Sequence, residues 1–389
     1  MIHKKIKNYL KIAVINLVIF YTLLYLIELG INFKKNKLFK NTRLYYLNSL
    51  EDKNPENKLY LNFGAYKLLD KKQKILPLSG YENSIIILCL DEYNQPVIFL
   101  SDNYGFNNSI NKNNDFLLIG DSYVQGMCVQ NKDNLNSQFK KFSYNTNSLA
   151  VGGNGPLLEL ATFKEYRNQY DYNSIILFIT PGNDYLDLSN EIKNETLLNY
   201  LNNKNFNQNL KDEENKKIKI SILNSFFGNK TKRFLNDIFS VYHFNLKSLV
   251  NSIEDLTKNK KIFKINYYYL YDKELDKFFI KILDEFISAL KNEEKKFYVV
   301  FNSVNPDILY PKSENAKKLK NLLLTEKLEI LKDFLKTKEI SYFDFNQYLI
   351  NKYNEDNISN IFKRIDGHWD HYTEEGFYEI TKQIHINLF

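Results

Sequence analysis

Four apolar residues, Phe116 to Ile119, lead directly into Gly120-Asp121-Ser122. A short apolar run of this kind fits a strand that is buried on both faces of a parallel sheet, and Gly120 allows a sharp turn where the strand ends. Ser122 would then lie at the carboxyl end of the strand, which is the edge where open α/β sheets bind ligands. Taken alone, Gly-Asp-Ser is also an ordinary turn sequence.

Strands and helices alternate after Ser122. The apolar and amphipathic stretches predict further strands over 144–151, 174–180, 296–303 and 340–345, and helices over 133–141, 156–170, 273–292 and 314–337. Alternation of this kind is typical of parallel sheets covered by helices. We therefore expect an α/β fold of three α/β/α layers around a mostly parallel five-stranded sheet.

The N-terminal residues 1–33 are expected to anchor the chain in a membrane. Residues 12–33 are mostly apolar and, as a helix, would span a hydrocarbon core of about 30 Å. Because no small-x-small cleavage site follows, an uncleaved anchor is preferred over a signal peptide; a buried core helix is the alternative. Basic residues flank both ends, so the positive-inside rule does not decide the orientation.

The charge of the chain is unevenly distributed. The net charge is +7, and residues 1–43 contain nine Lys and Arg residues against Glu28 alone. The rest of the chain is therefore nearly neutral, which argues against a nucleic-acid partner. The two cysteines, Cys89 and Cys128, cannot form a zinc site by themselves, although a disulfide between them is possible.

Residues 34–110 are expected to form a stalk and a β-hairpin. Residues 34–75 are polar and weakly patterned, whereas 84–90 and 96–100 alternate as two strands joined by a turn. Residues 111–389 would form the main domain. Within it, 189–262 does not follow the alternation and is predicted to be a helical insertion above the carboxyl edge of the sheet. It would serve as a lid, as a partner surface or as a structural excursion.

Four loops at this edge carry candidate chemistry: Gly120-Asp121-Ser122, Gly152-Gly153-Asn154-Gly155, Gly182-Asn183-Asp184 and Asp366-Gly367-His368-Trp369. Acyl transfer needs a nucleophile, a base, an acid that orients the base, and donors for the oxyanion. Ser122 is the candidate nucleophile. Asp366 and His368 are two residues apart, so in an extended segment both side chains point the same way, and Asp366 could orient His368 toward Ser122.

The oxyanion donors would come from three of these loops. The main-chain N–H groups of Ser122 and Gly153 and the side-chain amide of Asn183 could supply them. His371 is the rival base. Asp366, His368, Asp370 and His371 could instead bind a metal, but that reading leaves the serine and asparagine loops unexplained.

In this order, the four loops resemble the blocks of the SGNH hydrolases, the GDSL-like esterase superfamily. The resemblance covers residues from about 100 to 389 without the insertion, and 104–108 is similar to membrane-anchored bacterial members. It implies a flavodoxin-like fold, a serine esterase mechanism, and no cofactor or metal. The sequence departs from the family pattern at Tyr123, which stands in place of Leu. It also has Ser148-Leu149-Ala150 where Asn-Gly is frequent, and one residue between Asp366 and His368 instead of two.

These observations predict a serine esterase or acyltransferase that acts on ester-linked acyl groups, most simply acetyl groups on an envelope carbohydrate. The glycine-rich edge suggests an open crevice rather than the deep apolar channel of a lipase. We expect a single-pass membrane protein with its catalytic domain outside the cytoplasm. The alternative is a catalytically inactive, membrane-anchored binding protein of the cell envelope that keeps the same fold.

Overall fold

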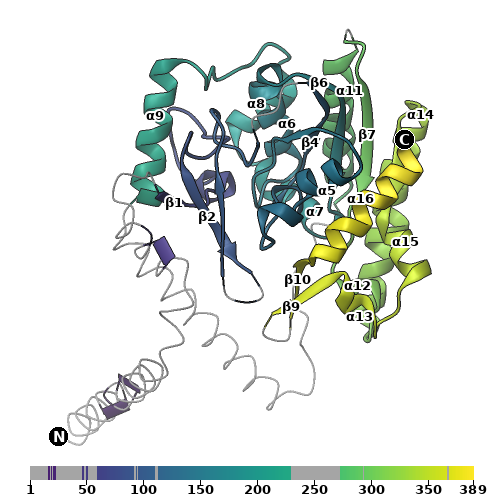
Figure 1. Cartoon of the computed structure of the whole chain (residues 1–389). Coiled ribbons are helices and arrows are strands. Elements are labelled where there is room, and N and C mark those ends of the chain that lie inside the picture. Colours follow the sequence, from purple (N-terminus) through teal and green to yellow (C-terminus); the bar gives the residue numbers. More distant parts are fainter. Residues whose placement is uncertain are drawn as a thin grey trace, which may run out of the picture. The chain divides into compact units, whose positions relative to one another are not determined.

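The computed structural model describes residues 59–91, 93, 95–109, 113–228, 272–291, 293–365 and 368–389, and single residues before 59 (Figure 1). The side chains of 227, 228, 364, 365 and 368–370 lie outside the description. The chain divides into two compact units, 1–55 and 56–389, and the fold below is that of the second unit.

The predicted anchor lies largely outside the described residues. Of residues 12–33, only 16, 17, 19, 21 and 22 are described, and all five are helical. Among the residues that the structure describes, no helix has both the length and the apolar character needed to cross a bilayer. The anchor, its orientation and the location of the protein therefore stay predictions.

The centre of the second unit is a sheet of five parallel strands. They are β4 (Asn114–Ile119), β5 (Thr146–Ser148), β6 (Tyr172–Ile179), β7 (Lys296–Phe301) and β8 (Ser341–Asp344), in the order β5-β4-β6-β7-β8. The predicted five-stranded parallel sheet is thus confirmed. The chain adds β5 on one side of β4 and the later strands on the other, so the topological switch point lies between β4 and β6.

Both faces of this sheet are covered by helices. Consecutive residues of the central strands, such as Leu117 and Leu118 on β4, are each 0% exposed. Since neighbouring residues of a strand point to opposite faces, neither face is open to solvent. The helices pack in separate groups, α6 with α8 and α11, and α5 with α16, which completes the three layers.

The helix bounds agree with the predicted alternation in most places. The helices are α4 (Ser122–Gln125), α5 (Leu135–Lys141), α6 (Pro156–Tyr166), α7 (Pro181–Glu191), α8 (Glu195–Asn202), α9 (Glu213–Leu223), α11 (Lys273–Leu290), α12 (Pro306–Leu309), α13 (Glu314–Lys320), α14 (Leu328–Thr337), α15 (Phe345–Lys352) and α16 (Glu374–Leu388). The single helix expected over 314–337 is α13 and α14, joined by a π-helical stretch, η6 (Asn321–Lys327).

A second sheet precedes the main one in the sequence. Its strands are β1 (Leu59–Leu61), β2 (Ile85–Leu90) and β3 (Pro96–Leu100), and the predicted hairpin is the antiparallel pair β2–β3. The end of the expected stalk, from β1 onward, belongs instead to the core, because Phe63 is 3% exposed and Leu68 is 0% exposed. Leu59, Leu61 and Phe63 are buried at alternate positions, a short strand pattern that the polar composition of 34–75 concealed.

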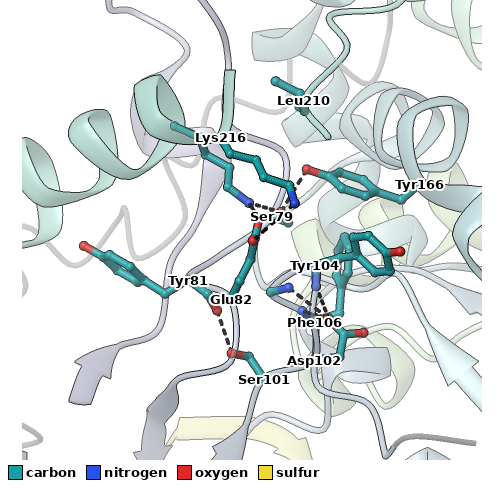
Figure 2. A network of polar contacts seen from close by, with 12 residues as sticks. Ser79, Tyr81, Glu82, Ser101, Asp102, Tyr104, Phe106, Tyr166, Leu210 and Lys216 are labelled. Atoms are coloured by element: carbon teal, nitrogen blue, oxygen red, sulfur yellow. Dashed lines mark hydrogen bonds and ion pairs between the residues drawn. The ribbon is translucent and has the colours of Figure 1, made fainter. Parts of the chain in front are cut away.

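The described part of the insertion holds this second sheet in place. Lys219 of α9 has a fully buried side chain whose Nζ lies 2.7 Å from Glu82 Oε1 and 3.2 Å from Ser79 Oγ. Ser79 also donates to Tyr166 Oη of α6 at 3.0 Å, so α9, the segment that leads into β2, and α6 meet in one polar network (Figure 2). These contacts fit the structural alternative for the insertion, whose residues 229–262 lie outside the description.

Candidate active site

The turn after β4 presents Ser122 at the start of α4. A side chain at Gly120 would place its Cβ 2.4 Å from Val124 Cγ2 and 3.2 Å from Phe178 Cβ, so only glycine fits. Asp121 is the N-cap of α4, and its Oδ1 accepts the N–H of Tyr123 at 3.0 Å. The turn therefore brings Ser122, which is half-buried, to the carboxyl edge of the sheet as predicted.

A histidine lies within hydrogen-bonding distance of this serine. Ser122 Oγ is 2.8 Å from Nε2 of His371, a residue 249 positions later in the chain. The imidazole packs beside the Tyr123 ring, with 4.7 Å between the ring centroids. A serine hydroxyl paired with an imidazole nitrogen is the arrangement that activates a serine nucleophile.

The hairpin of β9 (Phe362–Ile365) and β10 (His368–Tyr372) carries His371. Trp369 is paired with Arg364 and Tyr372 with Phe362, so three steps on β10 match two on β9. This irregularity is a β-bulge, which changes the direction of nearby side chains and often occurs beside active sites.

Contacts at the C-terminal end of the bulge hold it in position. Tyr372 is 1% exposed, donates its hydroxyl to Asn302 Oδ1, and accepts the Ser303 N–H at 3.1 Å. Thr373 then caps α16 by accepting the Gly376 N–H at 3.0 Å. His371 is thus followed directly by a buried tyrosine and by the start of α16, which fix the chain on its C-terminal side.

The structure therefore supports the rival histidine. The prediction placed His368 at Ser122, on the premise of an extended segment, but the position facing Ser122 Oγ is occupied by His371. The bulge in β10 accounts for the difference, because the side chains no longer alternate regularly across it. Asp366 and the side chain of His368 lie outside the described residues, so the acid that orients the base stays a prediction. The sequence did contain one signal for where this strand ends: Thr373-Glu374-Glu375-Gly376 is typical of a helix start, and it begins two residues after His371.

The loop after β5 that contains Gly152, Gly153 and Gly155, called the glycine loop below, lies against Ser122. A side chain at Gly152 would place its Cβ 3.6 Å from Ser122 Cβ. The Gly152 N–H donates to Gln125 Oε1 at 2.9 Å, and Gln125 exchanges two hydrogen bonds with the side-chain amide of Asn62, at 3.1 and 3.2 Å. Gln125 and Asn62 carried no sequence signal, yet they set the position of this loop.

Asn183 joins the loops after β4 and β6. It lies in the first turn of α7, and its Nδ2 donates to Asp121 Oδ2 at 2.8 Å. An asparagine amide has two N–H groups, and this contact uses one of them. Ser122 and Asn183, predicted for the same edge, are thus connected through Asp121.

Five acidic residues interact electrostatically beneath these loops: Asp121, Glu159, Asp184, Asp187 and Glu191. Burial is the main cause that raises each pKa; repulsion from Asp121 adds to the rise at Asp187, whose pKa is about 7. Glu191 accepts the N–H groups of Gly155 and Leu157 at 2.7 and 2.8 Å, which opposes the rise, and its pKa is about 8.

These raised pKa values predict that the protein is more stable in mild acid. A folded-state pKa above the unfolded value means that the folded protein binds the proton more tightly, so the free energy of unfolding falls as pH rises from about 4 to about 8. Replacing half-buried Asp187 with Asn should flatten part of this slope. Melting temperatures measured from about pH 5 to about pH 8 test this prediction. Asp333→Asn, at an exposed position of α14, is the control. An unchanged dependence of melting temperature on pH in Asp187→Asn would contradict the prediction.

Cys89 and Cys128 are both buried, and no disulfide joins them. The residues that the structure describes contain no group of three or more His, Cys, Asp or Glu side chains that could hold a metal ion. The side chains of 366, 368 and 370, which formed the metal alternative with His371, are not among those described.

No protein-family model and no curated protein matches the sequence. Similar solved structures include a G-D-S-L family protein, described as lipolytic, from Desulfitobacterium hafniense DCB-2, at 10% identity over 70% of this chain and 97% of that chain, with a TM-score of 0.34. A family 3 carbohydrate esterase from Clostridium thermocellum has 12% identity over 71% of this chain and 95% of its own, with a TM-score of 0.33. A variant of the esterase AlinE4 has 12% identity over 72% and 97%, with a TM-score of 0.31.

The fold of this chain is defined by its own strand order. Its parallel sheet in the order β5-β4-β6-β7-β8 places Ser122 after β4 and Asn183 after β6, on either side of the switch point. This strand order is the flavodoxin-like α/β/α arrangement that the sequence predicted.

Proposed function

We propose that this protein is a serine hydrolase acting on carboxylic esters, with Ser122 as nucleophile and His371 as general base. The observation that supports the proposal is the 2.8 Å contact between Ser122 Oγ and His371 Nε2. It lies at the carboxyl edge of a parallel sheet, beside a glycine loop and next to the start of a helix.

In the proposed reaction, His371 Nε2 takes the proton of Ser122 Oγ as this oxygen attacks the ester carbonyl carbon. The tetrahedral intermediate then releases the alcohol, which receives the same proton from His371, and an acyl-Ser122 ester remains. A water molecule that gives a proton to His371 attacks this ester, and collapse of the second intermediate returns the proton to Ser122 and frees the acid. A sugar hydroxyl in place of water would make the reaction a transfer.

Gly153 is the best-supported donor of the glycine loop to the oxyanion. The N–H groups of Gly152 and Gly155 are already bound by Gln125 and Glu191, at 2.9 and 2.7 Å. Gly153 lies between them with φ of +78°, a conformation that favours glycine. With the second amide N–H of Asn183 and the main-chain N–H of Ser122, it would complete the three donors expected from the sequence.

Replacing Asn183 with alanine should lower kcat by roughly 10²–10³-fold with little change in KM, because the donor acts on charge that develops in the transition state. The substitution would also break the 2.8 Å contact with Asp121 Oδ2, so the melting temperature of the variant is measured beside its kinetics. Steady-state kinetics on an aryl acetate check this. An effect on KM alone would show that Asn183 only binds substrate.

As the natural substrate, we propose an acyl ester, acetyl in the simplest case, on an envelope carbohydrate. The close approach of Gly152 to Ser122 favours a site in which main chain, rather than side chains, lines the nucleophile. Two experiments test the function. In the first, a fluorophosphonate probe should label the full chain at Ser122. In the second, acetate release from an acetylated oligosaccharide is compared with hydrolysis of a long-chain triglyceride. Preference for the triglyceride would contradict the carbohydrate; absence of labelling would favour the inactive binding protein.

A further inference from the structure

A segment outside the four loops reaches the candidate active site. Asn62 and Tyr66 follow β1 in the second sheet, and both contact the glycine loop beside Ser122. Asn62 acts through Gln125, whose Oε1 accepts the Gly152 N–H at 2.9 Å. Tyr66 contacts the next residue, Gly153, directly.

The Tyr66 ring lies against the main chain of Gly153. A side chain at Gly153 would place its Cβ 2.5 Å from both Cδ1 and Cε1 of Tyr66, and a side chain at Gly64 would place its Cβ 2.6 Å from Cε1. The ring is thus supported by two glycines. Its backbone is equally well held, because Ala65 and Leu68 of the same 3-10 turn, η1 (Ala65–Leu68), are each 0% exposed.

The ring is nevertheless open to solvent next to the nucleophile. Tyr66 is 46% exposed, although Gly153 and Gly64 pack against it. Gly152 approaches Ser122, with 3.6 Å between its Cβ position and Ser122 Cβ, and consecutive Cα atoms are about 3.8 Å apart. One residue of main chain therefore separates the contact with Ser122 from the contact with the exposed ring.

We propose that Tyr66 is a substrate-binding residue that packs against a sugar ring in the alcohol part of the ester, an inference that rests on the proposed function. An acetyl group has only one methyl beyond the reacting carbonyl, so it is too short to reach from Ser122 past Gly152 to the tyrosine. The alcohol part is the portion of the substrate that can extend this far.

The chemistry of the ring suits a pyranose. A rigid, half-exposed tyrosine ring offers a large apolar surface at low cost in conformational entropy, and a pyranose has a face of C–H groups that can cover it. Lys67 Nζ lies 5.6 Å from the centroid of the same ring. This nitrogen lies over the ring, so a sugar packed on the exposed part of the ring would lie beside a positive charge.

Kinetics on two acetate esters test the inference: ethyl acetate, which has no ring, and an O-acetylated methyl pyranoside. Tyr66→Ala should raise KM for the pyranoside about 2- to 10-fold, as expected for loss of one aromatic contact, and change neither kcat nor the kinetics on ethyl acetate. Tyr66→Phe should behave as the unchanged protein. Tyr93→Ala, at an exposed tyrosine of the β2–β3 turn, is the matched control and should have no effect.

Two results would overturn the inference. An equal loss on both esters would mean that Tyr66 only supports the Gly153 loop, and an unchanged KM for the pyranoside would mean that the ring does not touch the sugar. Titration calorimetry of the acetylated pyranoside with Ser122→Ala and with Ser122→Ala/Tyr66→Ala separates this inference from the proposed function. If no ester is hydrolysed, the proposed function fails. Weaker binding of the pyranoside to the double variant than to Ser122→Ala would still support Tyr66 as a sugar-binding residue. Equal binding to both variants, or binding to neither, would overturn the inference about Tyr66.

Discussion

Replacing Ser122 with alanine should lower turnover of an aryl acetate by about 10⁴-fold or more, leaving only what the oxyanion donors contribute. The substitution removes the oxygen that we propose attacks the carbonyl, and this Oγ lies 2.8 Å from His371 Nε2. The turn itself depends on Gly120 and on the Asp121 side chain, which accepts the Tyr123 N–H. We therefore expect the melting temperature to change little.

The control for this variant is Ser189→Ala, which removes a hydroxyl that donates to the Leu186 carbonyl on α7. It should leave kcat/KM unchanged. Mass spectrometry after incubation with a fluorophosphonate should find the adduct in the unchanged chain and in Ser189→Ala, and no adduct in Ser122→Ala. Substantial turnover by a folded Ser122→Ala variant would refute the assignment of the nucleophile.

Replacing His371 with alanine should lower kcat by about 10³–10⁵-fold, since an unassisted serine hydroxyl is a weak nucleophile at neutral pH. The expectation follows from the Nε2 contact and from the Tyr123 ring, which packs at 4.7 Å and keeps the imidazole in place. His368→Ala, at the histidine predicted from sequence, should cost much less. The measurement is the pair of kcat values at several pH values.

His385→Ala is the matched control, because His385 lies on α16 and its Nδ1 contacts Tyr144 Oη at 3.1 Å. If His368→Ala were the more damaged variant, the sequence-based base would be right and the contact seen at His371 would have another role. Strong losses in both variants would indicate that His368 acts on His371, for example as a neighbour that orients it.

The strands and the nucleophile turn could be predicted because their signals are local. The apolar run that forms β4 has to be buried on both faces, and glycine is required at 120, where a Cβ would lie 2.4 Å from Val124 Cγ2. Asn183 was placed correctly at the same edge for the same reason, since it follows the apolar strand β6 by a few residues. Its contact with Asp121 then follows from the position of the two strands as neighbours.

The base could not be chosen from spacing alone. Two histidines lie three residues apart in β10, and a regular strand would direct them to opposite faces. The bulge between Trp369 and Tyr372 alters this alternation, and it is set by the pairing of β10 with β9 and by the buried Tyr372 hydroxyl. These contacts join β10 to residues elsewhere in the chain, so the sequence of β10 alone does not reveal them.

By itself, therefore, the sequence determined the α/β class and the parallel sheet. It also placed Ser122 and Asn183 at the carboxyl edge of that sheet. Both were possible because burial and turn chemistry act over a few neighbouring residues. Only the tertiary structure decided which histidine meets Ser122, a contact across 249 positions. It also brought Asn62 and Tyr66 to the glycine loop. Such contacts depend on how separate elements pack against one another, and polar or aromatic loop residues carry no periodicity that could reveal their partners.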